Sequence, residues 1–416
     1  MQYHGNCVGS PCAAIPKNLR EPRLGGDHSM PLTPRERVLA AIHHEEPDRV
    51  PIVIGASNAT SMKLKPYRRL KELLGHQSED AFLYDWPELG TVLPDEFILQ
   101  RLRSDVRGVW DRFPQAVYER NRRRPPHTPF IDDWGIGQVE YEPGVWFPSL
   151  HPMQAAQSLK DIENYPWPDM DDPYRVAHVR QRAQQLAQEN RYAIMATPWL
   201  LFPFERAIAL QGMEHFFPNL VANRDFALAL LHKIAELCKK LMGHFLRELG
   251  EAVDIIKVGD DLGMQDGLLI SPKMYREVLK PIHADYIAFI KQHTNAKVFF
   301  HTDGDVFDLI DDLVEIGVDI LNPIQTSAGR MSNLGELKRR YGKNLCFCGA
   351  IDTYRVLPYG TPEQVRQEVR RVIELLAPGG GYLLASVHTI LDEVPPENIL
   401  AMVDAAEEFG KYPLKG

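Results

Sequence analysis

Cysteine, positive charge and long apolar runs are all scarce in this sequence. Its 416 residues include five cysteines, too few for a disulfide framework, and an odd count that leaves at least one thiol unpaired within the chain. No apolar run approaches the roughly 18 residues that a membrane span needs, and the N-terminus lacks the apolar core of a secretory signal. We therefore expect a cytoplasmic protein that does not enter a membrane.

Positively charged residues are fewer than negatively charged ones. Lys and Arg together number 47 against 56 Asp and Glu, which gives a net charge of −9. A protein with this balance has no overall positive field to attract a phosphate backbone, so nucleic-acid binding is disfavoured. The 44% hydrophobic content is typical of a globular chain with a large core.

Two segments differ in composition and periodicity from the rest of the chain. Residues 1–30 are rich in Gly, Pro and Asn and show no periodicity, which predicts a flexible N-terminal extension before a single domain over residues 31–416. From Pro125 to Pro148 several prolines surround the alternating Val139-Glu-Tyr141. This pattern predicts a β-hairpin inserted into the domain, where it could form a lid or a pocket wall.

The remaining chain alternates short apolar segments with longer helical ones. Parallel strands need such crossovers and are buried on both faces. We count eight strands, near residues 51, 106, 193, 254, 298, 319, 346 and 383. Eight βα units predict a (β/α)8 TIM barrel, an α/β fold. A doubly wound open sheet is the rival, but no Gly-x-Gly-x-x-Gly turn follows a strand.

A barrel of this type places its active site at the carboxyl ends of its strands. The expected strand ends are rich in polar residues: Asn58, Asp105, Trp199, Asp260, Asp261, His301, Asp303, Asn322, Gln325, Cys348, Asp352 and His388. An acid that follows a strand is often only the N-cap of the next helix, which is the simpler interpretation of each carboxylate taken alone. For Cys348, a buried inert thiol is favoured over a ligand or a nucleophile.

Two histidines each follow an apolar strand directly. A barrel would bring His301 and His388 to one mouth, where Asp303 could complete a three-ligand zinc site with an open position. The alternative is a pair of neutral, hydrogen-bonded strand-end histidines. No His-Glu-x-x-His motif or paired-cysteine spacing is present to decide between them.

Several stretches resemble the uroporphyrinogen decarboxylase superfamily, which includes methylcobamide:thiol methyltransferases and the methyltransferase components of corrinoid demethylation systems. The resemblance covers nearly the whole chain from Thr33 onward and implies a (β/α)8 barrel with its pocket at the C-terminal face. The matching stretches are Thr33-Pro-Arg-Glu-Arg-Val38, Glu46-Pro-Asp-Arg-Val-Pro51, Ser271-Pro-Lys-Met-Tyr275, Phe300-His-Thr-Asp-Gly304, Thr361-Pro-Glu363, Ala377-Pro-Gly-Gly-Gly-Tyr382, His388-Thr-Ile390 and Val394-Pro-Pro-Glu-Asn-Ile399.

The segment after the first strand indicates the branch of the superfamily. True uroporphyrinogen decarboxylases have an Arg-rich segment there that grips the carboxylates of the substrate, whereas this chain has Gly55-Ala-Ser-Asn58. The methyltransferase branch has a zinc site of His-x-Cys and a distant Cys. This chain is similar in position, with His301, Asp303 and His388, so harder ligands replace both sulfurs.

The resemblance therefore implies a metal-assisted methyltransferase or demethylase that moves a methyl group between a small-molecule substrate and a corrinoid. The corrinoid would be carried by a small partner protein, because this chain has no Asp-x-His-x-x-Gly motif. A homodimer is compatible with the sequence, which does not set the oligomeric state. The expected catalytic residues are Asp105, Asp260, His301 and His388; the expected substrate-binding residues are Asn58, Trp199, Asp261, Gln265 and Gln325.

Two rival functions remain open. One is a cofactor-independent decarboxylase of a small acid, in which Asp105 and His388 would stabilise the charge that develops as carbon dioxide leaves. The other is a non-catalytic ligand-binding barrel. The concentration of polar residues at the strand ends speaks against the second rival.

Overall fold

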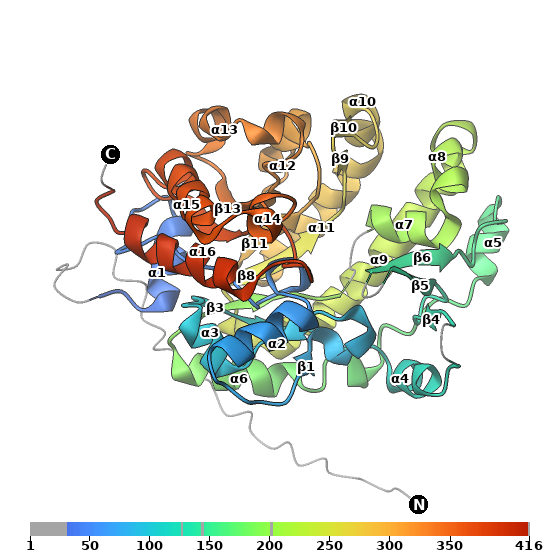
Figure 1. The fold of residues 1–416 in the computed structure, drawn as a ribbon. Helices are drawn as coiled ribbons and strands as arrows, with labels where there is room; N and C mark the ends of the chain where they lie inside the picture. The colour runs from blue at the N-terminus through green and yellow to red at the C-terminus, as the bar shows by residue number, and fades with distance from the viewer. Residues whose placement is uncertain (1–30, 126–127, 143–144, 200–202, 415–416) are drawn as a thin grey trace, which may run out of the picture. The chain divides into compact units, whose positions relative to one another are not determined.

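The computed structural model describes residues 31–125, 128–142, 145–199 and 203–414 (Figure 1). Leu32–Gly416 forms one compact unit. The predicted flexible extension over residues 1–30 lies outside the described residues. Within the part of the chain that is described, no helix combines the length and the apolar character needed to cross a membrane.

Seven parallel strands form the central sheet, in the order β14-β13-β12-β11-β8-β7-β3. Consecutive strands are neighbours, as right-handed βα units require. Each matches a strand predicted from the sequence. Their bounds are β3 (Val106–Val109), β7 (Ala193–Ala196), β8 (Ile255–Gly259), β11 (Lys297–His301), β12 (Ile320–Ile324), β13 (Cys346–Ile351) and β14 (Tyr382–Ser386).

The eighth predicted strand, near residue 51, closes the ring without forming a regular ladder. Ile52 makes a parallel bridge to Leu384 of β14, and the Val53 N–H donates to the Leu384 carbonyl at 2.8 Å. On its other side, the Asp105 N–H donates to the Ile52 carbonyl at 2.8 Å. The segment therefore lies between β14 and β3, and the fold is the predicted TIM barrel.

Side chains explain why this segment is not a regular strand. Pro51 has no N–H to donate. The N–H groups of Ile52 and Ile54 donate to the side chains of Asp105 (2.8 Å) and Ser104 (3.2 Å). These backbone N–H groups therefore bond to side chains instead of the backbone of a neighbouring strand.

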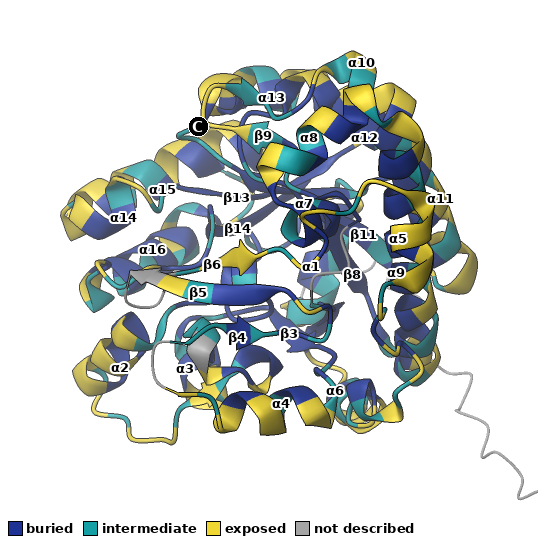
Figure 2. Ribbon diagram, turned by 90° about the vertical axis from the view of Figure 1, so that its right-hand side faces the viewer, coloured by how far each residue is buried: buried dark blue, intermediate teal, exposed yellow. Residues whose placement is uncertain are grey.

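Helices surround the sheet, and their exposed faces contrast with the buried strands in Figure 2. Capping boxes are present at Thr33 and Thr361, each of which begins a helix. The helices are α1 (Pro34–Ile42), α2 (Leu64–Leu73), α3 (Glu96–Arg101), α4 (Gln115–Arg122), α5 (Leu159–Asn164), α6 (Val179–Glu189), α7 (Pro203–Gln211), α8 (Met213–Ala222), α9 (Arg224–Leu249), α10 (Pro272–Met274), α11 (Lys280–His293), α12 (Ile310–Glu315), α13 (Leu334–Tyr341), α14 (Val356–Tyr359), α15 (Pro362–Leu376) and α16 (Pro396–Phe409).

Short antiparallel strands form three small sheets apart from the central sheet. The predicted hairpin is present as β5 (Gly137–Glu142) and β6 (Val145–Leu150), and β4 (Phe130–Ile131) adds a third strand that the sequence did not indicate. Two smaller pairs are β1 (Ala81–Phe82) with β2 (Val92–Leu93), and β9 (Gly263–Met264) with β10 (Gly267–Leu268).

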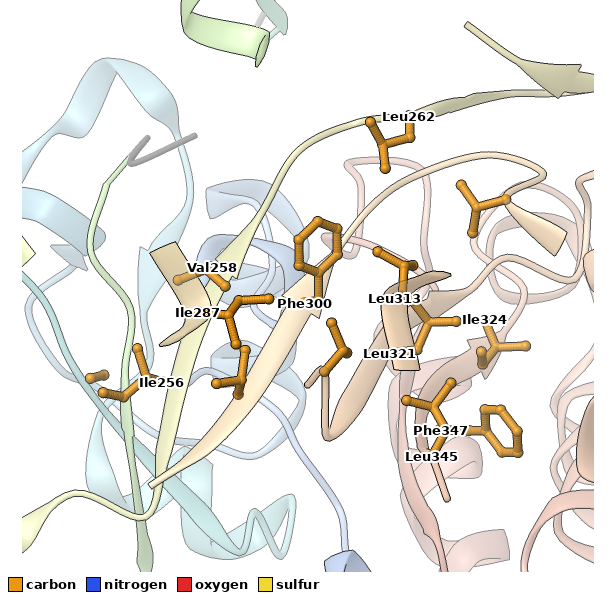
Figure 3. Packing of buried hydrophobic residues seen from close by; sticks show 14 of the residues in the cluster. Ile256, Val258, Leu262, Ile287, Phe300, Leu313, Leu321, Ile324, Leu345 and Phe347 are labelled. Carbon is orange, nitrogen blue, oxygen red and sulfur yellow. The ribbon is translucent and has the colours of Figure 1, made fainter. Parts of the chain in front are cut away.

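Alternate residues of each strand point to the two faces of the sheet. One set, including Ile256, Val258 and Phe300, packs against the helices (Figure 3). The other set, including Ile255 and Phe299, forms a separate apolar cluster with residues of α1. We take this second cluster as the interior of the barrel.

The interior set continues into polar residues toward the carboxyl ends of the strands. Lys257 lies two residues after Ile255, and His301 two residues after Phe299. Both are therefore expected to share the inward orientation of the apolar residues below them. The alternation along β8 and β11 thus places Lys257 and His301 at the mouth of the barrel.

Asp105 lies at the opposite end of the barrel from the predicted site. It precedes β3, which begins at Val106, and its side chain is fully buried. Its carboxylate accepts hydrogen bonds from Arg37 (2.7 Å), Arg49 (2.9 Å) and the Ile52 N–H (2.8 Å). The prediction that Asp105 lies at a carboxyl strand end was wrong, because the residue directly precedes its strand. Its contacts join α1, the closing segment and β3.

We expect Asp105→Ala to lower the free energy of unfolding by about 3–5 kcal/mol, because it leaves the buried guanidinium of Arg37 and the half-buried guanidinium of Arg49 without this shared partner. Urea denaturation measures the loss. Asp404→Ala is the control, since Asp404 pairs with Arg101 at the surface and should change stability by less than about 1 kcal/mol. Equal effects of the two substitutions would contradict the assigned role.

Candidate functional site

His301 ends β11 and is 6% exposed. Its Nδ1 lies 2.7 Å from Oδ1 of Asn322, and the amide of Asn322 is oriented by its own donation to the Cys348 carbonyl at 3.4 Å. An amide oxygen only accepts, so Nδ1 carries the proton and Nε2 keeps its lone pair. That lone pair is available for a metal or a proton.

Asp303 links this imidazole to a second one. Its Oδ2 lies 3.7 Å from Nε2 of His301 and 3.7 Å from Nε2 of His388. The two rings have centroids 5.4 Å apart, and one ligand atom from each of the three residues lies within 4.8 Å of the others. The structure therefore brings together the three side chains that the sequence suggested as a metal site.

The protonation states of this cluster suit a cation. Burial lowers the pKa of His301 to about 4 and that of His388 to about 4. Burial raises the pKa of Asp303 to about 6, although His301 opposes the shift. Near pH 7 both imidazoles are neutral and Asp303 is ionised, so the cluster presents two nitrogen lone pairs and one negative charge.

Lys257 and Glu205 belong to the same mouth, and sequence reasoning missed both. Lys257 is buried in β8, and its Nζ donates to Oδ1 of Asn58 at 3.1 Å. Burial lowers the Lys257 pKa to about 8, opposed by Glu205, Asp261 and Asp303. A lysine at an inward position of an apolar strand was the signal that could have revealed it.

Glu205 lies in the first turn of α7. Burial, followed by the charges of Asp261 and Asp260, raises the Glu205 pKa well above its usual range. No local motif marks this residue in the sequence, because its place at the mouth depends on how α7 is anchored.

Asp260 supplies that anchor. Its carboxylate accepts hydrogen bonds from the N–H groups of Phe204 (3.0 Å) and Glu205 (2.8 Å), and it contacts Nε2 of His283 at 2.9 Å. The Asp260 carboxylate therefore caps the start of α7, and both of its oxygens have hydrogen-bond partners. Asp260 therefore positions the backbone that carries Glu205, and its expected catalytic role stays a prediction.

Three of the expected substrate-binding residues bond to the loops around Asp303. Asp261 accepts from the Asp303 N–H (2.9 Å), Gln325 accepts from the Gly304 N–H (2.7 Å), and Gln265 donates to the Ser327 carbonyl. Asp261 and Gln325 brace the loop that presents Asp303, and Gln265 bonds to the loop after β12. Their expected role in substrate binding stays a prediction. Gly304 has φ +89°, and a Cβ there would come within 2.3 Å of backbone, so only glycine suits this loop.

Trp199 lies to one side of the cluster. Its ring packs against Tyr84 and Trp86, with centroids 4.8 Å and 5.4 Å away, and its backbone N–H donates to the Asp111 carboxylate at 2.7 Å. Cys348 is fully buried, and burial raises the pKa of its thiol to about 12. This agrees with the inert thiol that the sequence favoured.

Comparisons with known proteins place the chain among relatives of one kind. The family model for uroporphyrinogen decarboxylase (URO-D) matches residues 133–409. The uroporphyrinogen decarboxylase of Alkalilimnicola ehrlichii is 24% identical over 390 residues, which cover 91% of this chain and 95% of the relative. That of Neisseria meningitidis serogroup C is 26% identical over 187 residues, 44% of this chain and 49% of the relative, so this chain spans about half of its length.

A solved structure is similar over almost its whole length. A methyltransferase from Methanosarcina mazei superposes with a TM-score of 0.59 at 19% identity, covering 91% of this chain and 99% of the other. At this level of identity the similarity establishes the shared fold.

We expect the free energy of unfolding of Asp111→Asn, relative to that of the wild type, to increase as the pH rises. Burial raises the Asp111 pKa to about 7, whereas the unfolded chain ionises near 3.9. Between these values only the folded protein holds the proton, so the wild type loses stability with rising pH and the variant does not. Urea denaturation at pH 5 and pH 8 should show the variant gaining about 2 kcal/mol relative to the wild type; an equal difference at both pH values would contradict the assignment.

Proposed function

Since this chain belongs to the uroporphyrinogen decarboxylase family, we propose that it is a metal-assisted methyltransferase acting between a small molecule and a corrinoid. The supporting observation is the convergence of His301, Asp303 and His388 at the barrel mouth. The family includes enzymes, and the polar mouth of this barrel fits an enzyme.

The donor set fits zinc. Two imidazole nitrogens and one carboxylate oxygen make a usual zinc triad that leaves a position open. Tetrahedral ligands at zinc–nitrogen distances of about 2.0–2.1 Å lie about 3.3 Å apart, and both separations from Asp303 are 3.7 Å. The Asn322 hydrogen bond to Nδ1 of His301 is the kind of outer contact that orients a metal-binding imidazole.

Zinc held here would act as a Lewis acid toward the oxygen or sulfur that carries the methyl group. His301 and His388 would keep their lone pairs directed at the ion near pH 7. Glu205, whose pKa burial raises above its usual range, would give a proton to the departing oxygen or sulfur. The Lys257 ammonium would offset the negative charge of the surrounding carboxylates.

The charges at the mouth support a neutral substrate. Three acids, Glu205, Asp261 and Asp303, act on the buried Lys257, and the segment Gly55-Ala-Ser-Asn58 carries no arginine to bind carboxylates. A porphyrinogen with many carboxylates needs cationic groups at the rim of its pocket. Such a substrate does not suit this site, whereas a small methyl ether, alcohol or thioether does.

Decarboxylation of a small acid is the second candidate. The names of the curated relatives favour it, and the Lys257 ammonium could bind one carboxylate. Asp105 cannot take the part expected of it in that reaction, because it lies at the other end of β3. His388 alone remains of the proposed pair.

The corrinoid would be carried by a separate small protein that docks at the mouth of the barrel. This proposal rests on the sequence, which contains no Asp-x-His-x-x-Gly motif. The cluster lies at the end of the barrel where such a partner would have to approach.

We expect the protein, stripped with a chelator and titrated with zinc, to bind about one equivalent, measured by calorimetry and elemental analysis. His301→Ala or His388→Ala should abolish this binding, and Asn322→Ala should weaken it about 10–100-fold. His293→Ala is the control, because His293 is an exposed histidine whose Nδ1 contacts the Phe289 carbonyl. Equal zinc binding by wild type and His388→Ala would overturn the site.

Methyl transfer is tested by mixing zinc-loaded protein with cob(I)alamin and either methanol or dimethyl sulfide. We expect absorbance spectra to show methylcob(III)alamin, with the rate falling at least about 100-fold in His388→Ala because the activating ion is lost. The His293→Ala variant should keep the full rate. Carbon dioxide release from a small acid without zinc or corrinoid would instead support the decarboxylase.

A further inference from the structure

We propose that the hydroxyl of Tyr84 and the indole N–H of Trp199 form a hydrogen-bond-donating subsite that binds an acceptor oxygen of the substrate. The inference rests on the proposed function in one respect, since it gives the substrate of that site a second point of attachment. The ligand chemistry is an ether, carbonyl or carboxylate oxygen on a small molecule.

The backbone at Tyr84 is held in an unfavourable conformation. Tyr84 has φ +59° and ψ +18°, and Asp85 follows with φ +51°. A bulky residue in the left-handed region is a true outlier, and such outliers persist only where the surroundings enforce them. Here Tyr118 donates to the Tyr84 carbonyl at 2.7 Å, and Asp85 pairs with Arg112. The fold therefore fixes the direction of the Tyr84 side chain at a cost.

That side chain carries a polar group with no partner. Tyr84 is 1% exposed, and its hydroxyl makes no hydrogen bond within the described residues. The Thr197 side chain and the Asn58 backbone lie near it, since both influence its pKa, yet neither reaches bonding geometry. A buried hydroxyl without a partner is unusual in folded proteins. Its presence indicates a partner that arrives from outside the chain.

A second unpartnered donor lies beside the first. Nε1 of Trp199 also makes no hydrogen bond within the described residues. The two rings are 4.8 Å apart, and both line one small cavity together with Phe113 and several charged side chains. The charged residues of the lining are Asp111, Arg112, Asp133, Arg175 and Arg206. Two buried donors at one cavity match a group with several lone pairs, as an oxygen acceptor has.

The subsite adjoins the metal-binding cluster. Tyr84 approaches Asn58 and Thr197; Asn58 in turn accepts from Lys257 at 3.1 Å, and its carbonyl accepts from the Thr389 hydroxyl at 2.6 Å. Thr389 follows His388 in the chain. This series of contacts connects the subsite to the residue that follows His388, and we place the acceptor oxygen of the substrate at Tyr84 and Trp199.

A second buried tyrosine provides the contrast. Tyr286 in α11 also has a hydroxyl without a partner in the described structure, but its backbone is helical and it is not among the residues that line this cavity. Tyr286→Phe therefore serves as a matched control for Tyr84→Phe. Each substitution removes one buried oxygen and preserves the ring.

The test follows the indole 1H–15N resonance of Trp199 during titration of the full chain with two probes. The chain has six tryptophans, and Trp199→Phe identifies the resonance. The probes are sodium acetate, an anionic acceptor, and 1,2-dimethoxyethane, a neutral one. We expect at least one probe to shift the resonance saturably, with an apparent Kd that rises about tenfold in Tyr84→Phe and stays unchanged in Tyr286→Phe.

Thermal unfolding checks that the variants fold. Removing a hydroxyl that has no partner should leave the Tm of both tyrosine variants unchanged or raised. If Tyr84→Phe does not fold, the shift in Tm that the effective probe causes is compared between wild type and Trp199→Phe, which should lose it.

Two results would overturn the inference. One is a Trp199 resonance that neither probe shifts; the other is equal probe affinity in Tyr84→Phe and wild type. Because the titration involves no methyl transfer, a failure of the proposed reaction would leave this result standing, and the two proposals can be separated.

Discussion

Parallel strands in a closed ring must all end on the same side, and this constraint governs the candidate site. His301 and His388 are far apart in the chain, yet each leaves its strand at the same mouth. Alternation along each strand then decides which side chains point inward. The cluster needs no dedicated motif, because the barrel brings the ends of its strands together.

The two ends of the barrel use buried charge differently. At the closing segment, Asp105 is bonded by two arginines and a backbone N–H, so its charge is compensated and holds the fold together. At the mouth, Lys257, Glu205 and Asp303 have pKa values shifted by burial away from their usual ranges. Groups kept near a change of protonation state are typical of reactive sites. The compensated charge of Asp105 stabilises the fold, whereas Lys257, Glu205 and Asp303, with their shifted pKa values, are available for chemistry.

Much of the fold was predictable because apolar strands and capping boxes are local signals. The strands from Val106 onward were found from short apolar runs, and the Thr33–Glu36 capping box of α1 is a signal of the same local kind. The segment at Ile52 was harder, since its N–H donates to a side chain that lies far away in the sequence. Asp105 was misplaced for the related reason that a carboxylate looks the same before a strand as after one.

The site was predictable only where a residue directly follows a strand. His301, Asp303 and His388 satisfy that condition, and the structure brings them together. Glu205 does not, because its position depends on the capping of α7 by Asp260. Tyr84 carried no signal at all, since its backbone conformation and its unpartnered hydroxyl appear only in three dimensions.

The coordination of zinc by His301, Asp303 and His388 is the claim on which the proposed chemistry depends, and X-ray absorption at the zinc edge of the loaded protein measures it directly. The expected spectrum has nitrogen and oxygen ligands at about 2.0–2.1 Å with multiple scattering from two imidazoles, and no sulfur ligand near 2.3 Å. A sulfur shell, or a spectrum without imidazole scattering, would show that the ion is bound elsewhere and would contradict the mechanism.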